Sequence, residues 1–171
     1  MEKSKIKQLR RLNFGCGSDI KKDFDNVDVE YGKGIWKSFD FNTCPYPIKD
    51  NTYDYILARC ILEHLDKPEK ALMELWRISK PNGIIDIIVP HHANKGAYDD
   101  IEHKHYFNEN CFSFFVKDKR KIINKKAFKV VNMFSKPSRV GRVIPGKLRA
   151  FLSLFINGLY TKIFVRLEVV K

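Results

Sequence analysis

Two buried strands flanking a helix, within residues 53–90, constrain the fold most strongly. Residues 53–58 read YDYILA and residues 84–90 read IIDIIVP, and both are compact, mainly apolar runs of the kind found in strands covered on both faces. Between them, Pro68 suits the first position of a helix, and apolar residues recur at helical spacing before the KPNG stop at residues 80–83. Strands joined by such crossovers predict a parallel sheet in an α/β fold.

The remaining elements fit the same plan. Short strands are predicted within QLRRLNF, NVDVE and GIWKSFDF, and a histidine-rich loop covers residues 91–107. Asn108 can cap a helix that contains Phe112 and Phe115. Residues 127–134 read as a strand, and the alternating TKIFVRLEVVK at the end predicts another. The spacing of the apolar residues between 148 and 159 predicts an amphipathic helix: Leu148, Phe151, Leu152, Phe155 and Leu159.

Length and composition limit the class of protein. We expect one domain over residues 1–171. The longest uncharged run is Ala150–Thr161, much shorter than the about 20 residues of a spanning helix, so no transmembrane segment is predicted. The charged start MEKSKIKQLRR does not resemble a secretory signal. The four cysteines show no pairing rhythm, which favours free thiols and a cytoplasmic protein.

The positive charge lies in the second part of the chain. Residues 101–171 hold 16 of the 32 Lys and Arg but only 4 of the 20 Asp and Glu, so they account for the whole net charge of +12. Such an excess is either an ordinary solvated surface or a surface for an anionic partner. The anionic candidates are a phosphorylated metabolite, acidic lipid headgroups and RNA.

The stretch LNFGCGSD places two glycines directly after a predicted strand. Gly15 and Gly17 would let the backbone pass close to a ligand at the carboxyl edge of a parallel sheet, and Asp28 ends the next strand, where an acid can accept from ribose hydroxyls. Ile20 stands where a dinucleotide fingerprint has its third glycine, and Asp28 follows Gly17 by 11 residues instead of about 20. The helix between these strands must therefore be short or absent, and a nicotinamide site is excluded.

At this point the sequence resembles the class I S-adenosylmethionine-dependent methyltransferases, in particular the group with a short first helix and an LEHL motif. The resemblance rests on LNFGCGS, NVDVE, FDFNTCPYPIKDNTYDYILARCILEHL and LWRISKPNGIIDIIVP, and it covers about residues 9–116. It implies a three-layer Rossmann-like fold with a mostly parallel, seven-stranded sheet whose last strand is antiparallel. Residues 117–171 would form a basic segment on the substrate side.

The resemblance also implies a cofactor, S-adenosyl-L-methionine, and a set of residues that bind it. Asn13, Gly15 and Gly17 would border its methionine part, Asp28 its ribose, and Asp40 with Phe41 its adenine. Many relatives have an acid where Asn13 stands, so its amide oxygen would have to bind the ammonium group. The full set expected at the cofactor is Asn13, Phe14, Gly15, Cys16, Gly17, Asp28, Val29, Asp40, Phe41, Ala58 and Arg59.

The methyl acceptor would bind beside the histidine-rich loop. The family's D-x-x-H-x-x-x-F pattern matches Asp100, His103 and Phe107, which places His103 near the acceptor as a candidate base, with His64 of LEHL as a second candidate. The alternative for each histidine is a purely structural role. We expect no metal; the alternative is a zinc or iron site formed by the loop's histidines and carboxylates.

The basic segment allows three interpretations. Its amphipathic helix packs on the sheet as core, or lies on an anionic membrane near a lipid acceptor, or its cations bind RNA together with KDKRKIINKK. An anionic partner would meet residues 117–149, and the protein would then be peripheral at a membrane in the second case. The rival to a methyltransferase is a non-catalytic module of the same fold that binds RNA or another anionic partner through this segment.

Overall fold

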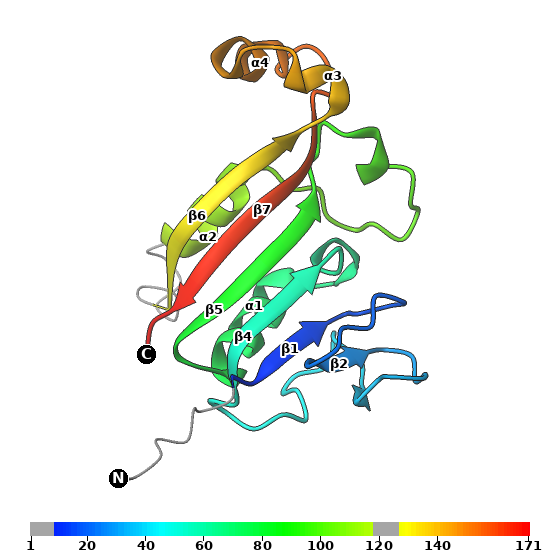
Figure 1. Cartoon of the computed structure of the whole chain (residues 1–171), viewed down its shortest axis with the longest axis vertical. Helices are drawn as coiled ribbons and strands as arrows, with labels where there is room; N and C mark the ends of the chain where they lie inside the picture. Colours follow the sequence, from blue (N-terminus) through cyan, green and yellow to red (C-terminus); the bar gives the residue numbers. More distant parts are fainter. Residues whose placement is uncertain (1–8, 118–126) are drawn as a thin grey trace, which may run out of the picture.

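The computed structural model describes residues 9–117 and 127–171, and these form a seven-stranded sheet in the order β3-β2-β1-β4-β5-β7-β6 (Figure 1). The strands are β1 (Arg11–Phe14), β2 (Asp25–Asp28), β3 (Lys37–Ser38), β4 (Tyr53–Arg59), β5 (Ser79–Pro90), β6 (Phe128–Pro137) and β7 (Tyr160–Val169). The α-helices are α1 (Pro68–Ile78), α2 (Glu109–Lys117), α3 (Arg139–Arg142) and α4 (Gly146–Leu152), and the 3-10 helices are η1 (Leu62–His64) and η2 (Lys95–Ala97).

The sheet is parallel from β3 through β5, and β7 runs antiparallel to both β5 and β6. This confirms the predicted mostly parallel sheet with an antiparallel last strand. In register, Phe14 lies between Val27 of β2 and Ala58 of β4, and Ala58 lies beside Ile87 of β5. The carboxyl ends of these strands therefore meet at one edge, where α/β folds of this kind bind ligands.

The core lies between the sheet and the two longer helices. Helix α1 buries the predicted apolar stripe, Ala71, Leu72, Leu75 and Ile78, and burying each large side chain stabilises the fold by about 1.5–3 kcal/mol. Helix α2 begins after Asn108, whose side-chain oxygen accepts a hydrogen bond from the Cys111 N–H at 3.1 Å, as a capping residue does. Both helices lie on the same face of the sheet (Figure 1).

The opposite face of the central strands carries half-buried side chains, among them Tyr55, Leu57, Ile88 and Phe164. A hollow of about 340 Å³ on this face is lined by strand residues alone. Within the described ranges no helix covers this face (Figure 1). The connection from β1 to β2 is a chain of turns, as its short length predicts.

The prediction of an amphipathic helix over residues 148–159 is wrong. Helix α4 ends at Leu152, and Gly158 with a φ of +86° belongs to a turn before β7. β6 and β7 are joined beyond the end of the sheet, so α3 and α4 project past it and the apolar side chains of α4 do not pack on a sheet face (Figure 1). Phe155 is 75% exposed and Leu154 is 74% exposed, which corrects the interpretation of this helix as core.

Two smaller differences concern a short strand and a basic stretch. Strand β3 has two residues, Lys37–Ser38, within the longer GIWKSFDF stretch that was expected to be a strand. The stretch KDKRKIINKK lies, after Lys117, outside the described residues. Among the described helices, none combines the length and the apolar character needed to cross a bilayer.

Candidate functional site

The glycine turn after β1 is held at the edge of the sheet by backbone hydrogen bonds. The N–H groups of Gly15 and Cys16 both donate to Val27 O, at 3.0 and 3.1 Å. Gly15 has a φ of +66°, and a Cβ there would lie 2.5 Å from Cγ1 of Ile61. Gly17 has a φ of +49°, and a Cβ there would meet no atom within 4 Å. The turn therefore faces open space at Gly17, whereas the Ile61 side chain fills the space above Gly15.

Asn13 connects this turn to β2 from inside. Its side chain is buried, and its amide nitrogen donates to Asp19 O at 2.8 Å and to Oδ1 of Asn26 at 2.9 Å. Asn26 in turn accepts from the N–H of Lys21 at 2.9 Å. These bonds use both N–H groups of the Asn13 amide, so its oxygen is the side-chain atom that remains for a ligand.

Asp28 lies at the end of β2, directly beside the glycine turn. Its Oδ2 accepts from the Gly17 N–H at 2.6 Å, and its Oδ1 accepts from the Val29 N–H at 2.9 Å. Val29 is exposed next to it. Each carboxylate oxygen has two lone pairs, so Asp28 can still accept hydrogen bonds from a ligand in the open space over Gly17.

Asp40 follows β3 and points into its own turn. Its Oδ1 accepts from the Asn42 N–H at 2.8 Å, and its Oδ2 accepts from the Thr43 hydroxyl at 2.9 Å. Phe41, expected at the adenine, is buried, with its ring 4.2 Å from the ring of Phe14. The side chain of Phe41 is therefore part of the aromatic core and does not face open space.

The other residues predicted to bind the cofactor lie either in the protein core or at the rim of the site. Phe14 and Ala58 are fully buried and support the turn from below. Burial and the nearby Asp28 raise the pKa of Cys16 to about 11, so its thiol is protonated at neutral pH and is no nucleophile. Arg59 is at the rim, where its guanidinium lies 3.2 Å from Oδ2 of Asp19.

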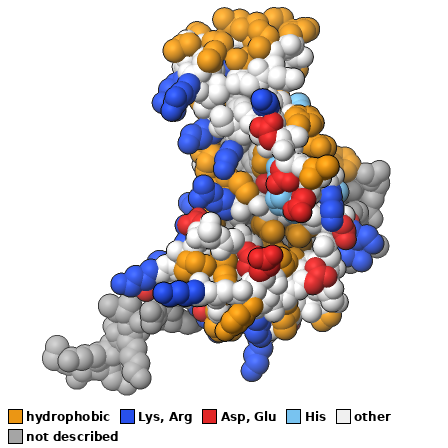
Figure 2. All heavy atoms as spheres, turned by 90° about the vertical axis from the view of Figure 1, so that its right-hand side faces the viewer, with side chains coloured by type: hydrophobic (Ala, Val, Ile, Leu, Met, Phe, Trp, Pro, Cys, Tyr) orange, Lys and Arg blue, Asp and Glu red, His pale blue; other side chains and the backbone are white. Residues whose placement is uncertain are grey.

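A hollow of about 650 Å³ opens beside the carboxyl ends of β4 and β5. It is lined by Cys60, Glu63, His64, Pro90, Asn94, Gly96, Asp99, Asp100, Ile101, His103, Thr161 and Lys162. The rings of His64 and His103 are 4.7 Å apart in an edge-to-face arrangement. Figure 2 shows histidine and acidic side chains gathered on this side of the molecule. Both candidate bases thus lie in one hollow, although they are 39 residues apart in the chain.

The ionisable groups in this hollow are shifted by burial. Burial raises the pKa of Glu63 to about 6. The contact with its own backbone N–H and the charges of His103 and Lys162 oppose this rise. Burial and the neighbouring His103 lower the pKa of His64, against a hydrogen bond to the backbone of Glu102. His64 is therefore mainly neutral at pH 7 and can accept a proton.

The remaining histidines of the loop are not part of this cluster. His91 is buried between His92 and Tyr160, with ring centroids at 4.7 and 5.1 Å, and its Nδ1 accepts from the Ala93 N–H. Nε2 of His105 lies 3.4 Å from Asp66 O. The loop histidines are thus separated, and the metal site considered from the loop's residues alone does not form.

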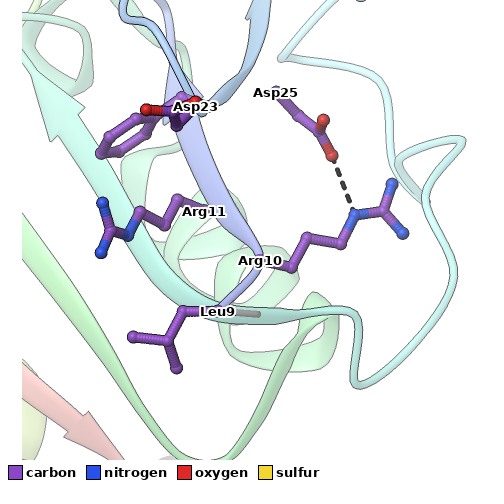
Figure 3. Close-up of a pocket in the computed structure, with 6 residues that line it drawn as sticks. Leu9, Arg10, Arg11, Asp23 and Asp25 are labelled. Carbon is purple, nitrogen blue, oxygen red and sulfur yellow. Dashed lines mark hydrogen bonds and ion pairs between the residues drawn. The ribbon is translucent and has the colours of Figure 1, made fainter. Parts of the chain in front are cut away.

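A different hollow, of about 390 Å³, lies at the opposite edge of the sheet, where β1 and β2 begin (Figure 3). Arg10 points toward Asp25 there, and the two form an ion pair at 2.9 Å. The glycine turn and Asp28 lie at the other ends of these strands, so this hollow is separate from the candidate site.

Comparison with known proteins gives a consistent result. The family model described as "Methyltransferase domain" matches residues 23–87. A structure of an S-adenosylmethionine-dependent methyltransferase from Archaeoglobus fulgidus superposes with a TM-score of 0.65 at 15% identity, covering 94% of this chain and 86% of that one. Residues 23–87 thus match a methyltransferase family model, and the chain has the fold of solved S-adenosylmethionine-dependent methyltransferases.

Two further proteins are similar to this chain. A putative sarcosine dimethylglycine methyltransferase from Galdieria sulphuraria has a TM-score of 0.63 at 17% identity over 95% of this chain and 78% of that one. An uncharacterized protein of Methanocaldococcus jannaschii is 33% identical over 89 residues, which are 46% of this chain and 39% of that protein. The match thus spans well under half of the length of that relative.

S-adenosylmethionine is the cofactor named for the Archaeoglobus fulgidus neighbour. Its adenosine carries ribose hydroxyls, which fit a carboxylate with lone pairs to spare, and Asp28 offers one at the rim of the open space over Gly17. The residues present therefore fit the cofactor at Gly17 and Asp28. At Gly15 the side chain of Ile61 fills the space where a Cβ would lie, and at Phe41 the ring packs against Phe14.

Three contributors were missed by the sequence analysis. Ile61 packs on Gly15, Asp19 bonds to both Asn13 and Arg59, and Glu63 joins the two candidate bases. The spacing of Glu63 and His64 within LEHL marks them as neighbours. However, only the fold brings His103 back to them, so no local pattern could have revealed this cluster.

Proposed function

We propose that this protein is a methyltransferase that transfers a methyl group from S-adenosylmethionine to an acceptor bound in the hollow next to His64 and His103. The observation that supports this most is the common edge of the sheet: Gly17 lies in the turn after β1, Asp28 ends β2, and the hollow opens beside β4 and β5. The cofactor seat and the acceptor hollow are then neighbours, as an in-line displacement requires.

The cofactor supplies an activated methyl group on a positively charged sulfur. The chain's own residues would hold the adenosine at Asp28, with Asn13 and Asp40 nearby, and would align the acceptor. Alignment and exclusion of water account for most of the rate in such a reaction. If the acceptor is protonated at neutral pH, His64 or His103 would accept its proton, whereas an acceptor that already has a free electron pair at neutral pH would need no such base.

Transfer of a labelled methyl group from S-adenosylmethionine tests this proposal on a panel of small molecules, lipids and RNA. Labelled product is expected for at least one acceptor class, and Asp28→Asn should reduce its formation. Glu30→Gln, which alters an exposed carboxylate two residues away, should leave it unchanged. Cofactor binding without transfer to any of these acceptors would support the non-catalytic module instead.

We further propose that α3, α4 and the turn after them dock on an anionic lipid surface. Exposed apolar side chains cover this projecting segment: Val140, Val143, Leu148, Phe151, Leu154, Phe155 and Ile156. Figure 2 shows them as an apolar cap at the top of the molecule. Arg139, Arg142 and Lys147 are exposed beside them. Apolar side chains flanked by cations suit an anionic membrane better than RNA, because RNA phosphates gain nothing from the apolar part.

A further inference from the structure

Glu63 is a buried carboxylate that the protein itself does not satisfy. It belongs to η1 and is 1% exposed, and neither of its side-chain oxygens has a hydrogen-bond partner among the described residues. A buried carboxylate without a partner is costly, and buried acids in proteins are therefore paired or bind a metal ion. The position of Glu63 calls for a positive charge at its oxygens.

Two imidazoles lie within reach of this carboxylate. One donor atom each from Glu63, His64 and His103 can be chosen so that all lie within 4.8 Å of one another. The His103 side chain is only 7% exposed. Three donor atoms, two nitrogens and one carboxylate oxygen, thus meet in a largely buried corner of the hollow.

The fold fixes these donors by backbone contacts. The N–H groups of Lys104 and His105 donate to Glu63 O at 2.8 and 3.1 Å, which ties the loop carrying His103 to η1. Nδ1 of His103 is 2.8 Å from Ala97 O, so this nitrogen carries the proton and Nε2 keeps its lone pair. A histidine that binds a metal usually donates its other N–H to a carbonyl or carboxylate in this way.

We propose that Glu63, His64 and His103 bind one divalent transition-metal ion, such as Zn²⁺. Two histidines and one carboxylate are a donor set that Zn²⁺ and non-haem Fe²⁺ accept, with further coordination positions left open. Those positions would face the hollow of about 650 Å³, which also gives the ion a path of entry. The three residues come from two segments, which explains why the loop alone does not form a site.

The bound ion changes what the two histidines can do. A ring nitrogen that coordinates a metal has no lone pair left for a proton, so the ion-bound protein would not use that nitrogen as the base in methyl transfer. Metal binding itself does not depend on methyl transfer. The site can therefore be tested without any acceptor, and its failure leaves the proposed methyl transfer untouched.

Metal titration of the full chain, made without an affinity tag and stripped with a chelator, tests the proposal. Zn²⁺ is titrated against a chromophoric chelator, and Co²⁺ is added in parallel because its visible spectrum reports coordination. We expect one ion per chain, and about a 100-fold or greater loss of affinity in Glu63→Gln and in His103→Gln. His92→Gln, in the same loop but exposed and outside the cluster, should bind as the unchanged protein does.

Thermal melting gives a second readout that separates binding from folding. Zn²⁺ should raise the melting temperature of the unchanged protein and of His92→Gln, but not that of Glu63→Gln. Without metal, Glu63→Gln should melt no lower than the unchanged protein at pH 8, because it removes an unpaired buried charge. If Glu63→Gln does not fold, His103→Gln decides by itself. Absence of stoichiometric binding, or equal affinity in both variants and the unchanged protein, would overturn the metal site.

Discussion

The carboxylate of Asp28 accepts a hydrogen bond from the backbone N–H of Gly17 at 2.6 Å. This contact joins the end of β2 to the turn after β1 across the edge of the sheet. It also leaves open space on the side of Gly17 where a Cβ would project. A ligand that contacts both residues therefore finds a carboxylate and an uncovered backbone next to each other.

The two glycines of the turn should respond differently to alanine. Gly15→Ala places a Cβ against Ile61 in a left-handed backbone conformation, and we expect the free energy of unfolding to fall by about 2–4 kcal/mol. Gly17→Ala has the same backbone penalty but no clash, so it should cost about 1 kcal/mol. Urea unfolding measures both. Equal losses would contradict the packing of Ile61 on Gly15.

Asn13→Asp should destabilise the fold, although many members of the family that the sequence resembles have an acid at this position. The Asn13 amide donates to two acceptors, Asp19 O and Asn26 Oδ1, and a carboxylate in its place would face both without a proton to donate. We expect a loss of about 2–3 kcal/mol at pH 7 in urea unfolding. The combined variant in which Asn26 is also changed to Ser should lose less than the sum, since one acceptor is removed.

Glu109 should make the fold sensitive to acid. Its contact with His91, an ion pair at 3.8 Å when the imidazole is charged, and the hydrogen bond from the Ser135 hydroxyl lower its pKa to about 2. The unfolded chain has the ordinary pKa of 4.5. The stabilisation is therefore complete above pH 4.5 and is lost as the pH falls toward 2.

Glu109→Gln tests this pH dependence. The side chain of Glu109 is 39% exposed, so water screens the interaction and we expect the variant to lose on the order of 1 kcal/mol at pH 7. Near pH 2 the two proteins should be about equally stable. A constant difference between pH 7 and pH 2 in urea unfolding would show that the carboxylate does not act through its charge.

The proposed lipid surface is tested by sedimentation with vesicles. Vesicles rich in phosphatidylserine should carry the protein down, and neutral phosphatidylcholine vesicles should carry much less. Replacing Phe151 and Phe155, whose exposed rings contact each other, by Ser should reduce binding to the anionic vesicles. The change of Phe114 to Ser, an exposed aromatic on α2, serves as the control. Equal binding of all three proteins would argue against docking through α4.

The sequence predicts where most of the strands lie along the chain because aliphatic runs, caps and glycines act locally. Pro68, Asn108 and Gly15 each mark the beginning or end of an element that the structure contains. The prediction of a helix over residues 148–159 is wrong because the helical spacing of apolar residues does not reveal whether another part of the protein lies opposite them to pack on them. The meeting of Glu63 with His103 could not be predicted, because 40 residues separate them and only backbone bonds to the loop bring them together.

Calorimetric titration with S-adenosylhomocysteine tests the central claim, that Asp28 and Gly17 form the cofactor seat. We expect one site per chain with a Kd below about 1 mM, equivalent to a binding free energy beyond about −4 kcal/mol. Asp28→Asn should weaken binding about 10-fold or more, since it removes a charged acceptor of the ribose hydroxyls, and Glu30→Gln should bind as the unchanged protein does. No binding at millimolar concentration, or equal binding by Asp28→Asn, would contradict the account.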